Sequence, residues 1–265
     1  MNQLVDFFSN VPVFAQLRDP FLFWVLSAIC AFSIGFSKNG VSGLAVLVVP
    51  LMAIIFPAKA STGILLPLLI AGDCVALWSF RAHGDWKHII RSLPWALIGI
   101  CCGWIVMGYP GFSGVLFKRF IGGIVIFVIF LGEYLAWRGN SDNNLRISHT
   151  LFFVIFFGVL GGFATMTANA AGPVFAVYLL ALNLPQENFI GSSARIFFIL
   201  NLLKVPFSAQ LALINVETLI FDIMVLPFLV VGAYFGFRTA KIIPQKIFNY
   251  IIKALAFIAA LKLIF

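Results

Sequence analysis

The sequence predicts an all-α polytopic membrane protein, and its composition and apolar runs carry that prediction. Of its 265 residues, 62% are hydrophobic and only 10% are charged, whereas a soluble domain has about 25% charged residues. So few charges could not cover the apolar surface of a soluble protein of this size. A nucleic-acid-binding protein is excluded despite the net charge of +8, because the Lys and Arg residues lie mostly between or at the ends of apolar runs.

About eight to ten apolar segments have the length that a transmembrane helix needs, about 20 residues, or fall slightly below it. Breaks of Gly, Pro or charged residues separate them. Residues 1–19 lack the basic start of a signal peptide, and we expect them to form an N-terminal interfacial arm. The expected segments are 20–36, 41–56, 60–80, 89–108, 114–137, 147–165, 169–184, 188–207, 217–237 and 246–265.

Two of these segments, 41–56 and 169–184, are short for a spanning helix. Each follows a stretch rich in Gly and small polar residues, at 35–43 and 161–173. Irregular backbone is tolerated at membrane depth only where it lines an enclosed cavity. We therefore expect broken or re-entrant helices near these two stretches.

The two stretches belong to an internal repeat that we expect to comprise residues 20–137 and 147–265, joined by a cytoplasmic linker at 138–146. Matched residues recur in order at offsets of 128 and 133, which indicates a duplicated unit. The matches are Pro57 with Pro185, Gly63 with Gly191, Asp73 with Asn201, and Pro94, Gly99 and Gly103 with Pro227, Gly232 and Gly236.

The charge of the loops predicts how the halves are oriented. The loops at 81–91 and 238–246 are basic, while their repeat equivalents at 208–216 and 109–113 have no Lys or Arg. The positive-inside rule places the basic loops in the cytoplasm and both termini outside. Because each half has an odd number of segments, we expect the two halves to be inverted repeats.

Together these motifs resemble the sulfite exporter TauE/SafE family over about residues 20–265. The resemblance implies a permease of the bacterial inner membrane that moves small sulfur-containing anions, such as sulfite, thiosulfate, sulfoacetate or related sulfonates. The features that carry it are the break at 35–43 with Val49-Pro50, the stretch 57–63, the spaced Pro94, Gly99 and Gly103, the break at 161–173, the stretch 185–193, and Asn201 with Lys204.

An inverted repeat with broken helices is typical of a secondary transporter that binds its substrate near the membrane midplane. Helix N-termini at the two breaks would offer unpaired N–H groups and positive dipole ends to an anion. Lys38 would balance the anion's charge; alternatively, it is a topology charge in an ordinary cytoplasmic turn. The expected substrate-binding residues are Ser37, Lys38, Asn39, Ser42, Thr165, Thr167 and Asn169.

Four further residues are candidates for coupling or gating. Asp73 lies about 13 residues, or roughly 20 Å, into its segment, where a carboxylate is costly and suggests function. It would carry a coupling proton or hold a lysine in place; alternatively, it is hydrated and paired with Arg81 or a neighbour. Asn201, its repeat partner, is expected on the other side of the midplane.

Lys204 lies one turn beyond Asn201, on the same helix face. It would take part in coupling; alternatively, it snorkels outward. Arg195 would support the residues that contact the substrate, or act as a gate; alternatively, its side chain snorkels to the cytoplasm. Asp222, near the start of its segment, is expected in water.

Other function classes explain the sequence less well. A passive channel for the same anions stays open, because sequence does not separate a channel from a carrier. An intramembrane protease is less favoured: Gly40–Gly43 and Gly111–Gly114 match GxSG, but the histidines lie in loops or at segment ends, so no base is within reach.

The expected partners are a small anion and the lipid bilayer, with a homodimer left open and no cofactor or metal. The four cysteines are expected as buried, free thiols.

Overall fold

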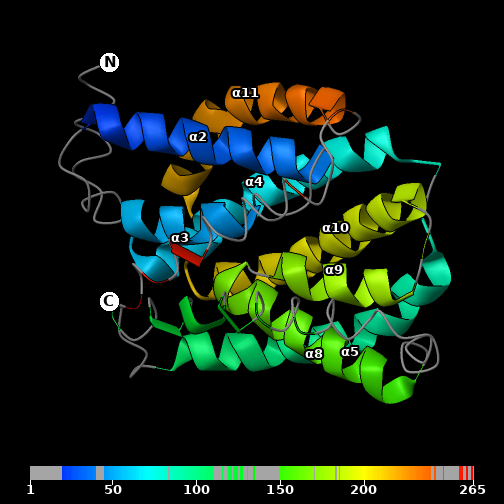
Figure 1. Cartoon of the computed structure of the whole chain (residues 1–265). Helices are drawn as coiled ribbons and strands as arrows, with labels where there is room; N and C mark the ends of the chain where they lie inside the picture. The colour runs from blue at the N-terminus through cyan, green and yellow to red at the C-terminus, as the bar shows by residue number, and fades with distance from the viewer. Residues whose placement is uncertain are drawn as a thin grey trace.

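The computed structural model describes residues 20–39, 45–82, 84–109, 150–169, 171–182, 184 and 186–239, with scattered positions between 115 and 134 and between 242 and 264. Every regular element in these parts is a helix, which confirms the all-α prediction (Figure 1). The helices are α2 (Pro20–Asn39), α3 (Ala45–Ile55), α4 (Ala58–Ser79), α5 (Trp86–Gly108), α8 (Leu151–Ala168), α9 (Ala171–Ala181), α10 (Gln186–Gln210) and α11 (Val216–Thr239).

In the described parts of the chain, α2, α4, α5, α8 and α11 are long and apolar enough to cross a bilayer. The protein is thus a multi-pass membrane protein. α10 is also long, at 25 residues, or roughly 37 Å, but it carries several polar side chains. It can do so because it lies inside the bundle.

α3 and α9 are half-length helices of 11 residues each. At 1.5 Å per residue each is about 16 Å long, roughly half of a hydrocarbon core of about 30 Å. The sequence predicted short segments here, although it placed both breaks too early. α2 continues to Asn39 and α8 to Ala168, so most of the Gly-rich stretch before each short helix is itself helical.

The helices form two groups, which we call the first bundle (α2, α3, α4 and α11) and the second bundle (α5, α8, α9 and α10). Within them, α2 packs along α11 and α5 packs along α8, while α4 and α10 meet where the bundles join (Figure 1). Each bundle therefore takes one helix from the opposite half of the sequence, since α11 lies with the first half and α5 with the second.

Glycines bring the paired helices into backbone contact, and they do so in the same way in both bundles. A Cβ at Gly35 would strike the carbonyl of Leu229, and one at Gly162 would strike the carbonyl of Ala96. These contacts correspond in the repeat, because Gly35 and Gly162 are 127 residues apart and Ala96 and Leu229 are 133 apart. A second matched set joins Gly232 to Phe32 and Gly99 to Val159.

The helices of the two halves run in opposite directions in the bundle. In Figure 1, α2 and α4 run from left to right, whereas α8 and α10 run from right to left; α5 and α11 are likewise opposed. The repeat-matched contacts and these directions have the form that the sequence predicts for inverted repeats.

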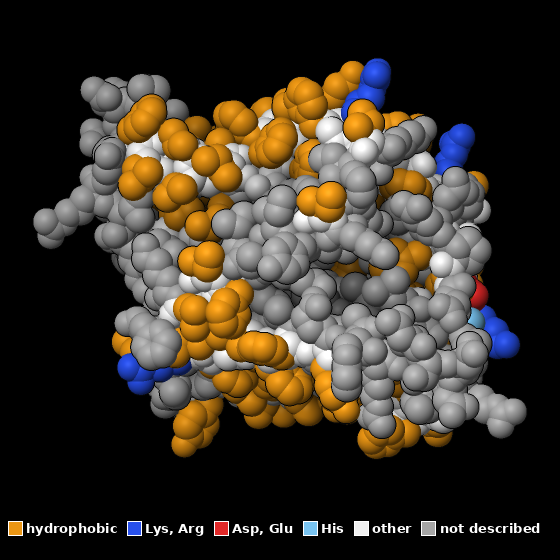
Figure 2. Space-filling model, viewed as in Figure 1, with side chains coloured by type: hydrophobic (Ala, Val, Ile, Leu, Met, Phe, Trp, Pro, Cys, Tyr) orange, Lys and Arg blue, Asp and Glu red, His pale blue; other side chains and the backbone are white. Residues whose placement is uncertain are grey.

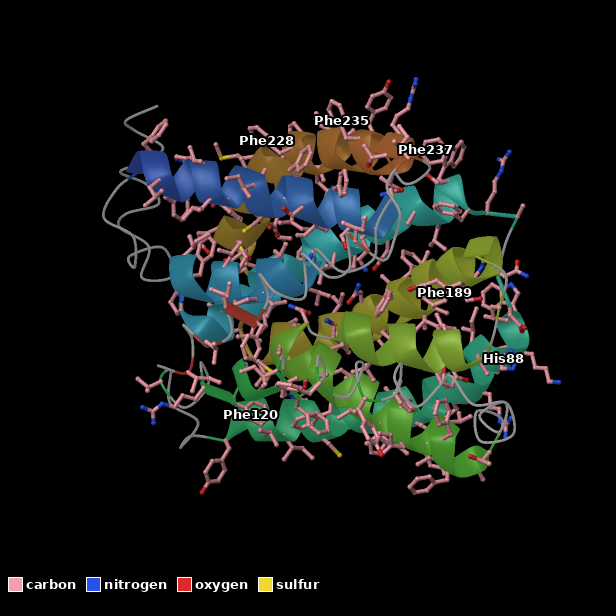
Figure 3. The ribbon with its side chains drawn as sticks, in the orientation of Figure 1. His88, Phe120, Phe189, Phe228, Phe235 and Phe237 are labelled. Carbon is pink, nitrogen blue, oxygen red and sulfur yellow. The ribbon has the colours of Figure 1, made fainter. Side chains whose placement is uncertain are left out.

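The outer surface suits a lipid environment. Figure 2 shows apolar side chains over the middle of the described surface and Lys and Arg side chains toward its two ends. On α11, Phe228, Phe235 and Phe237 are between 43% and 49% exposed and project outward (Figure 3). The expectation of buried thiols holds for Cys30 but is wrong for Cys74 and Cys102, which lie on outer helix faces.

Candidate functional site

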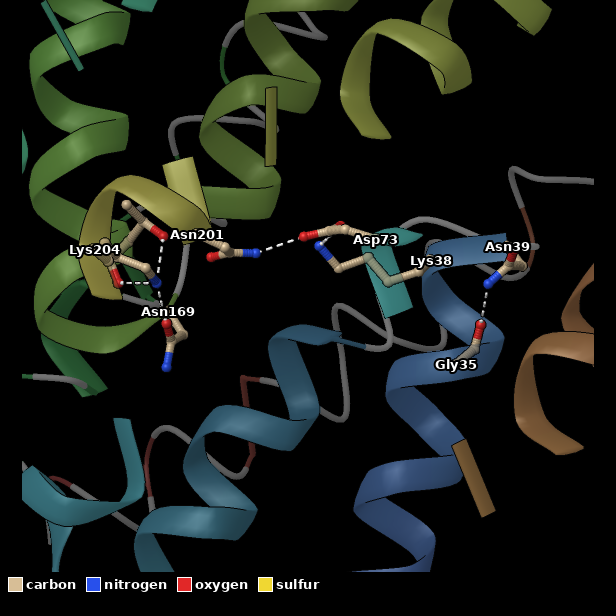
Figure 4. A network of polar contacts seen from close by, with 8 residues as sticks. Gly35, Lys38, Asn39, Asp73, Asn169, Asn201 and Lys204 are labelled. Carbon is tan, nitrogen blue, oxygen red and sulfur yellow. Dashed lines mark hydrogen bonds and ion pairs between the residues drawn. The ribbon is translucent and has the colours of Figure 1, made fainter. Parts of the chain in front are cut away.

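A network of buried polar side chains joins the two bundles where α4 and α10 meet (Figure 4). Such groups are costly inside a membrane protein and mark a functional site by default. The network lies beside the apolar core and draws on α2, α4, α8 and α10. Its members are Lys38, Asp73, Thr165, Asn169, Asn201 and Lys204.

Asp73 lies at the centre of this network and is fully buried. Its Oδ1 accepts a hydrogen bond from Lys38 Nζ at 2.5 Å, and its Oδ2 accepts one from Asn201 Nδ2 at 2.6 Å. Both carboxylate oxygens therefore have a charged or amide donor. The expected pairing with Arg81 does not form, and the pairing with a lysine does.

Asp73 and Asn201, matched by the repeat, touch each other directly. The sequence placed them on opposite sides of the midplane, but their side chains meet where α4 crosses α10. If the two halves are related by a two-fold axis, as the sequence predicts, two equivalent positions can meet only close to that axis. Because one position is Asp and the other is Asn, the Asn201 amide can donate to the Asp73 carboxylate. Two carboxylates at these positions would repel each other.

Lys204 is a buried lysine whose partners in the described part of the chain are all neutral. Its Nζ donates to Thr165 O at 3.1 Å, to Thr165 Oγ1 at 3.1 Å and to Asn169 Oδ1 at 2.5 Å. Three oxygen acceptors match the three N–H bonds of an ammonium group. Lys204 is 2% exposed, so the snorkelling interpretation is wrong, and in the described residues no carboxylate lies within ion-pairing distance of it.

Asn169 fixes the position of the Lys204 ammonium. It ends α8 in the left-handed conformation, with φ of 50°, which Asn tolerates better than most residues. Its Nδ2 donates to Thr62 O of α4 at 2.8 Å, so its Oδ1 must face Lys204. α9 begins at Ala171, so the N–H groups of its first turn, which have no acceptor within the helix, follow this residue closely in the chain.

Lys38 lies in the last turn of α2 and is committed to Asp73. Its ammonium also lies 4.5 Å from the centre of the Phe197 ring, a cation–π contact with α10. Neither sequence-based interpretation describes this arrangement. Lys38 is not a solvated topology charge, since its side chain is 12% exposed, and its charge is already balanced by the carboxylate.

Two other expected binding residues, Asn39 and Thr167, make hydrogen bonds within their own helices. Asn39 Nδ2 and Thr167 Oγ1 donate to backbone carbonyls one turn earlier in their own helices, and both side chains are buried. Ser37 is also buried, on α2. Ser42 lies outside the described residues. Thr165 and Asn169 are the two members of the second break that reach Lys204.

Arg195 lies more than two turns into α10, and its side chain reaches the α4–α5 loop. Its guanidinium donates to Arg81 O at 2.8 Å and to Gly191 O at 2.9 Å, and it lies 5.7 Å from the Trp86 ring centre. The side chain thus ties the loop to α10. This contact suits the expected gate better than a side chain that only reaches for water.

The same loop is held by Asp85, which caps α5 and whose N–H donates to Ser192 Oγ at 2.8 Å. The Asp85 carboxylate lies 3.0 Å from His88 Nδ1. Partial burial raises the pKa of Asp85, but the hydrogen bond and charge of His88 lower it more, so that this pKa lies below its usual value. The loop between the bundles is therefore closed by polar contacts.

The expectation that Asp222 is in water is wrong. It is 5% exposed, and neither carboxylate oxygen has a hydrogen-bond partner in the described part of the chain. The beginning of α11 is covered because Phe221 packs against Phe23 and Phe56 from the first half. Asp222 is therefore shielded from water although it lies near the start of α11.

Sequence reasoning also missed three residues that complete these contacts. The Thr62 carbonyl accepts the hydrogen bond that orients Asn169. The Ser192 hydroxyl accepts a hydrogen bond from the backbone N–H of Asp85, and the Phe197 ring packs on the Lys38 ammonium. Thr62 and Ser192 lie in the repeated stretches 57–63 and 185–193, which was the available signal. Nothing in the sequence distinguishes Phe197 from the other phenylalanines.

Residues 27–263 match the family model described as Sulfite exporter TauE/SafE. This match covers most of the chain, so the protein belongs to that family. No curated protein matches the chain, and no solved structure matches it.

Proposed function

We propose that this member of a sulfur-anion transporter family is a secondary transporter of small sulfur-containing anions, such as sulfite, thiosulfate or sulfonates like sulfoacetate, in the bacterial inner membrane. The anion binds beside Lys204, where α4 and α10 bring the two bundles together. The observation that carries this proposal is a buried ammonium group that has only neutral oxygen partners.

Burying a charge without a counterion is unfavourable by several kcal/mol. An anion that approaches Lys204 recovers part of this cost: two unit charges 4 Å apart attract by about 4 kcal/mol at an effective dielectric constant near 20. Lys38 offers much less, because Asp73 already neutralises it. We therefore assign the charge-balancing role to Lys204 in place of Lys38.

Neutral donors for the anion are present around the same point. The first N–H groups of α9 have no partner within that helix, and they carry its positive dipole end. Asn169 and Asn201 add amide groups, each fixed by a partner on α4. Together these groups suit a small oxyanion with several acceptor oxygens.

The repeated architecture supports a carrier. An inverted repeat with half-length helices at equivalent places is typical of alternating-access transporters, and the matched glycine contacts and opposed helix directions agree with one. The orientation with both termini outside rests on the loop charges alone. For Asp73, the ion pair supports the role of holding Lys38 more than the role of carrying a proton.

A binding measurement tests this function. Purified protein is titrated with sulfite, thiosulfate, sulfoacetate and acetate while its thermal unfolding is followed, because a ligand of the folded state raises stability by mass action. The three N–H bonds of Lys204 already have acceptors, so Lys204→Met removes a charge attraction; it should weaken binding by up to about 4 kcal/mol, or roughly 1000-fold at most.

Lys87→Met is the matched control, since Lys87 is an exposed lysine at the start of α5; it removes the same charge far from the network and should bind like the wild type. Unchanged binding by Lys204→Met would contradict the site. Counterflow in proteoliposomes then separates a carrier from a channel, because only a carrier is accelerated by substrate on the opposite side.

A further inference from the structure

The net charge of the buried polar network determines which charge on a bound ligand would make the site neutral. Lys38 and Asp73 form an ion pair, so their charges cancel. Asn201 and Asn169, which fill the remaining contacts, are neutral. Lys204 has three neutral acceptors among the described residues, so the network as a whole carries one positive charge when Lys204 is protonated.

No other described charge enters this balance. Among the described residues the ion pairs are Lys38 with Asp73 and His88 with Asp85, and neither includes Lys204. Asp222 is buried too, but it lies on α11, which packs against α2 and α4 and not along α10. Arg195 is on α10 but turns to the backbone of the α4–α5 loop.

We propose that the network selects anions with a single negative charge, and that Asp73 sets this selectivity. This inference rests on the proposed function, because it assumes that the anion binds beside Lys204. One negative charge makes the buried site neutral. A dianion would leave one uncompensated negative charge in the same place, at the cost that accompanies any unpaired buried ion.

The chemistry of sulfur oxyanions makes this distinction specific. Hydrogen sulfite and the organic sulfonates carry one negative charge, whereas sulfate, thiosulfate and fully deprotonated sulfite carry two. All present a similar cluster of acceptor oxygens, so hydrogen bonding alone separates them poorly. Discrimination by the count of buried charges does not require a different shape of pocket.

Asp73 sets the balance because it is the acidic member of the network. Asp73→Asn keeps the size of the side chain and places there the residue found at its repeat position, Asn201. It leaves Lys38 without its counterion, so that the network carries two positive charges. That variant should favour dianions.

The double variant Asp73→Asn, Lys38→Met separates charge from structure. It removes both members of the ion pair and returns the network to one positive charge on Lys204. If Asp73 acts through charge, the double variant should regain the preference of the wild type for a monoanion. If Asp73 only supports the fold, the double variant should be at least as impaired as the single one.

The experiment compares methanesulfonate with sulfate, two tetrahedral anions of similar size with one and two charges. Dissociation constants are measured by calorimetry at constant ionic strength and neutral pH. We expect the wild type to bind methanesulfonate at least about tenfold more tightly than sulfate, and Asp73→Asn to lower that ratio at least about tenfold. Glu217→Gln, which removes a half-buried carboxylate in the first turn of α11, should keep the wild-type ratio.

The outcomes separate this inference from the proposed function. Equal binding of the two anions by the wild type, or an unchanged ratio in Asp73→Asn, overturns the charge selectivity and leaves the transporter proposal standing. If neither anion nor sulfite binds the wild type, the proposed function fails as well. If Asp73→Asn does not fold, the wild-type ratio and the double variant still decide.

Discussion

Replacement of Gly162 by alanine should destabilise the protein because it pushes α8 away from α5. A Cβ at this position would lie 2.7 Å from the carbonyl carbon of Ala96, which is backbone and cannot turn aside. Overpacking of this kind costs about 1–3 kcal/mol. In contrast, a Cβ at Gly123, which is helical and exposed, would meet nothing within 4 Å, and Gly123→Ala should stabilise by roughly 0.5–1 kcal/mol.

The two variants should therefore shift thermal unfolding in detergent in opposite directions. For chains of about 150–250 residues, 1 kcal/mol moves the midpoint by about 2–4 °C, so Gly162→Ala should lower it by several degrees. Gly35→Ala tests the repeat, since Gly35 makes the matching contact with Leu229 and should be equally sensitive. A Gly162→Ala protein that unfolds at or above the wild-type temperature would refute the packing argument.

Two further predictions concern orientation and an isolated carboxyl group. Single cysteines at positions 85 and 213, in a background without other cysteines, should label from opposite sides of the membrane, because the two loops occupy equivalent places in inverted halves; labelling from one side would rule the inversion out. Asp222→Leu should unfold at the wild-type temperature or above it, because it removes two buried oxygens that lack hydrogen-bond partners among the described residues. A midpoint several degrees lower would show that the carboxyl group has a stabilising contact.

The helices were predictable because a lipid environment leaves the chain little choice. Backbone groups in hydrocarbon must be satisfied within the segment, so an apolar run of about 20 residues becomes a helix. The predicted segments 60–80, 89–108 and 217–237 accordingly lie within a few residues of α4, α5 and α11. The short α3 and α9 were also expected, since their apolar runs were too short to span.

The ends of the two breaks were not predictable, because glycine has two uses in a membrane helix. It can interrupt the helix, or it can stay helical and admit a neighbouring backbone. Gly35 and Gly162 do the second. Composition is the same in both cases, so the sequence predicted a break where the structure has a helix–helix contact.

The members of the site were easier to predict than their pairing. Lys38, Asp73 and Lys204 stood out because charges are rare in apolar segments. Which of them meet depends on the relative depth and rotation of helices far apart in the chain, and apolar periodicity sets neither. In the function that we propose, Lys204 carries the charge that faces the anion, because Lys38 forms an ion pair with Asp73.

The arrangement of these contacts limits how the protein could alternate its access. The close glycine contacts lie within each bundle, so each bundle is suited to move as a unit that combines helices of both sequence halves. Lys38 and Asp73 are both in the first bundle, while Lys204 and its acceptors are on α8 and α10 or at the end of α8. If one bundle slid past the other, the Lys38–Asp73 ion pair and the hydrogen bonds of Lys204 to Thr165 and Asn169 would stay intact.

Such a motion must break the contacts that join the bundles. Near the centre, the described contacts between the bundles include the hydrogen bonds from Asn201 to Asp73 and from Asn169 to Thr62 and the cation–π contact of Lys38 with Phe197, and the loop that Arg195 holds adds another. A neutral hydrogen bond contributes about 0.5–1.5 kcal/mol and one to a charged group about 1.5–3 kcal/mol, well below the cost of separating a buried ion pair. The ion pair thus lies within one bundle, and amide hydrogen bonds join the two bundles. This arrangement would let the proposed site open to either side of the membrane without leaving the Asp73 carboxylate unpaired.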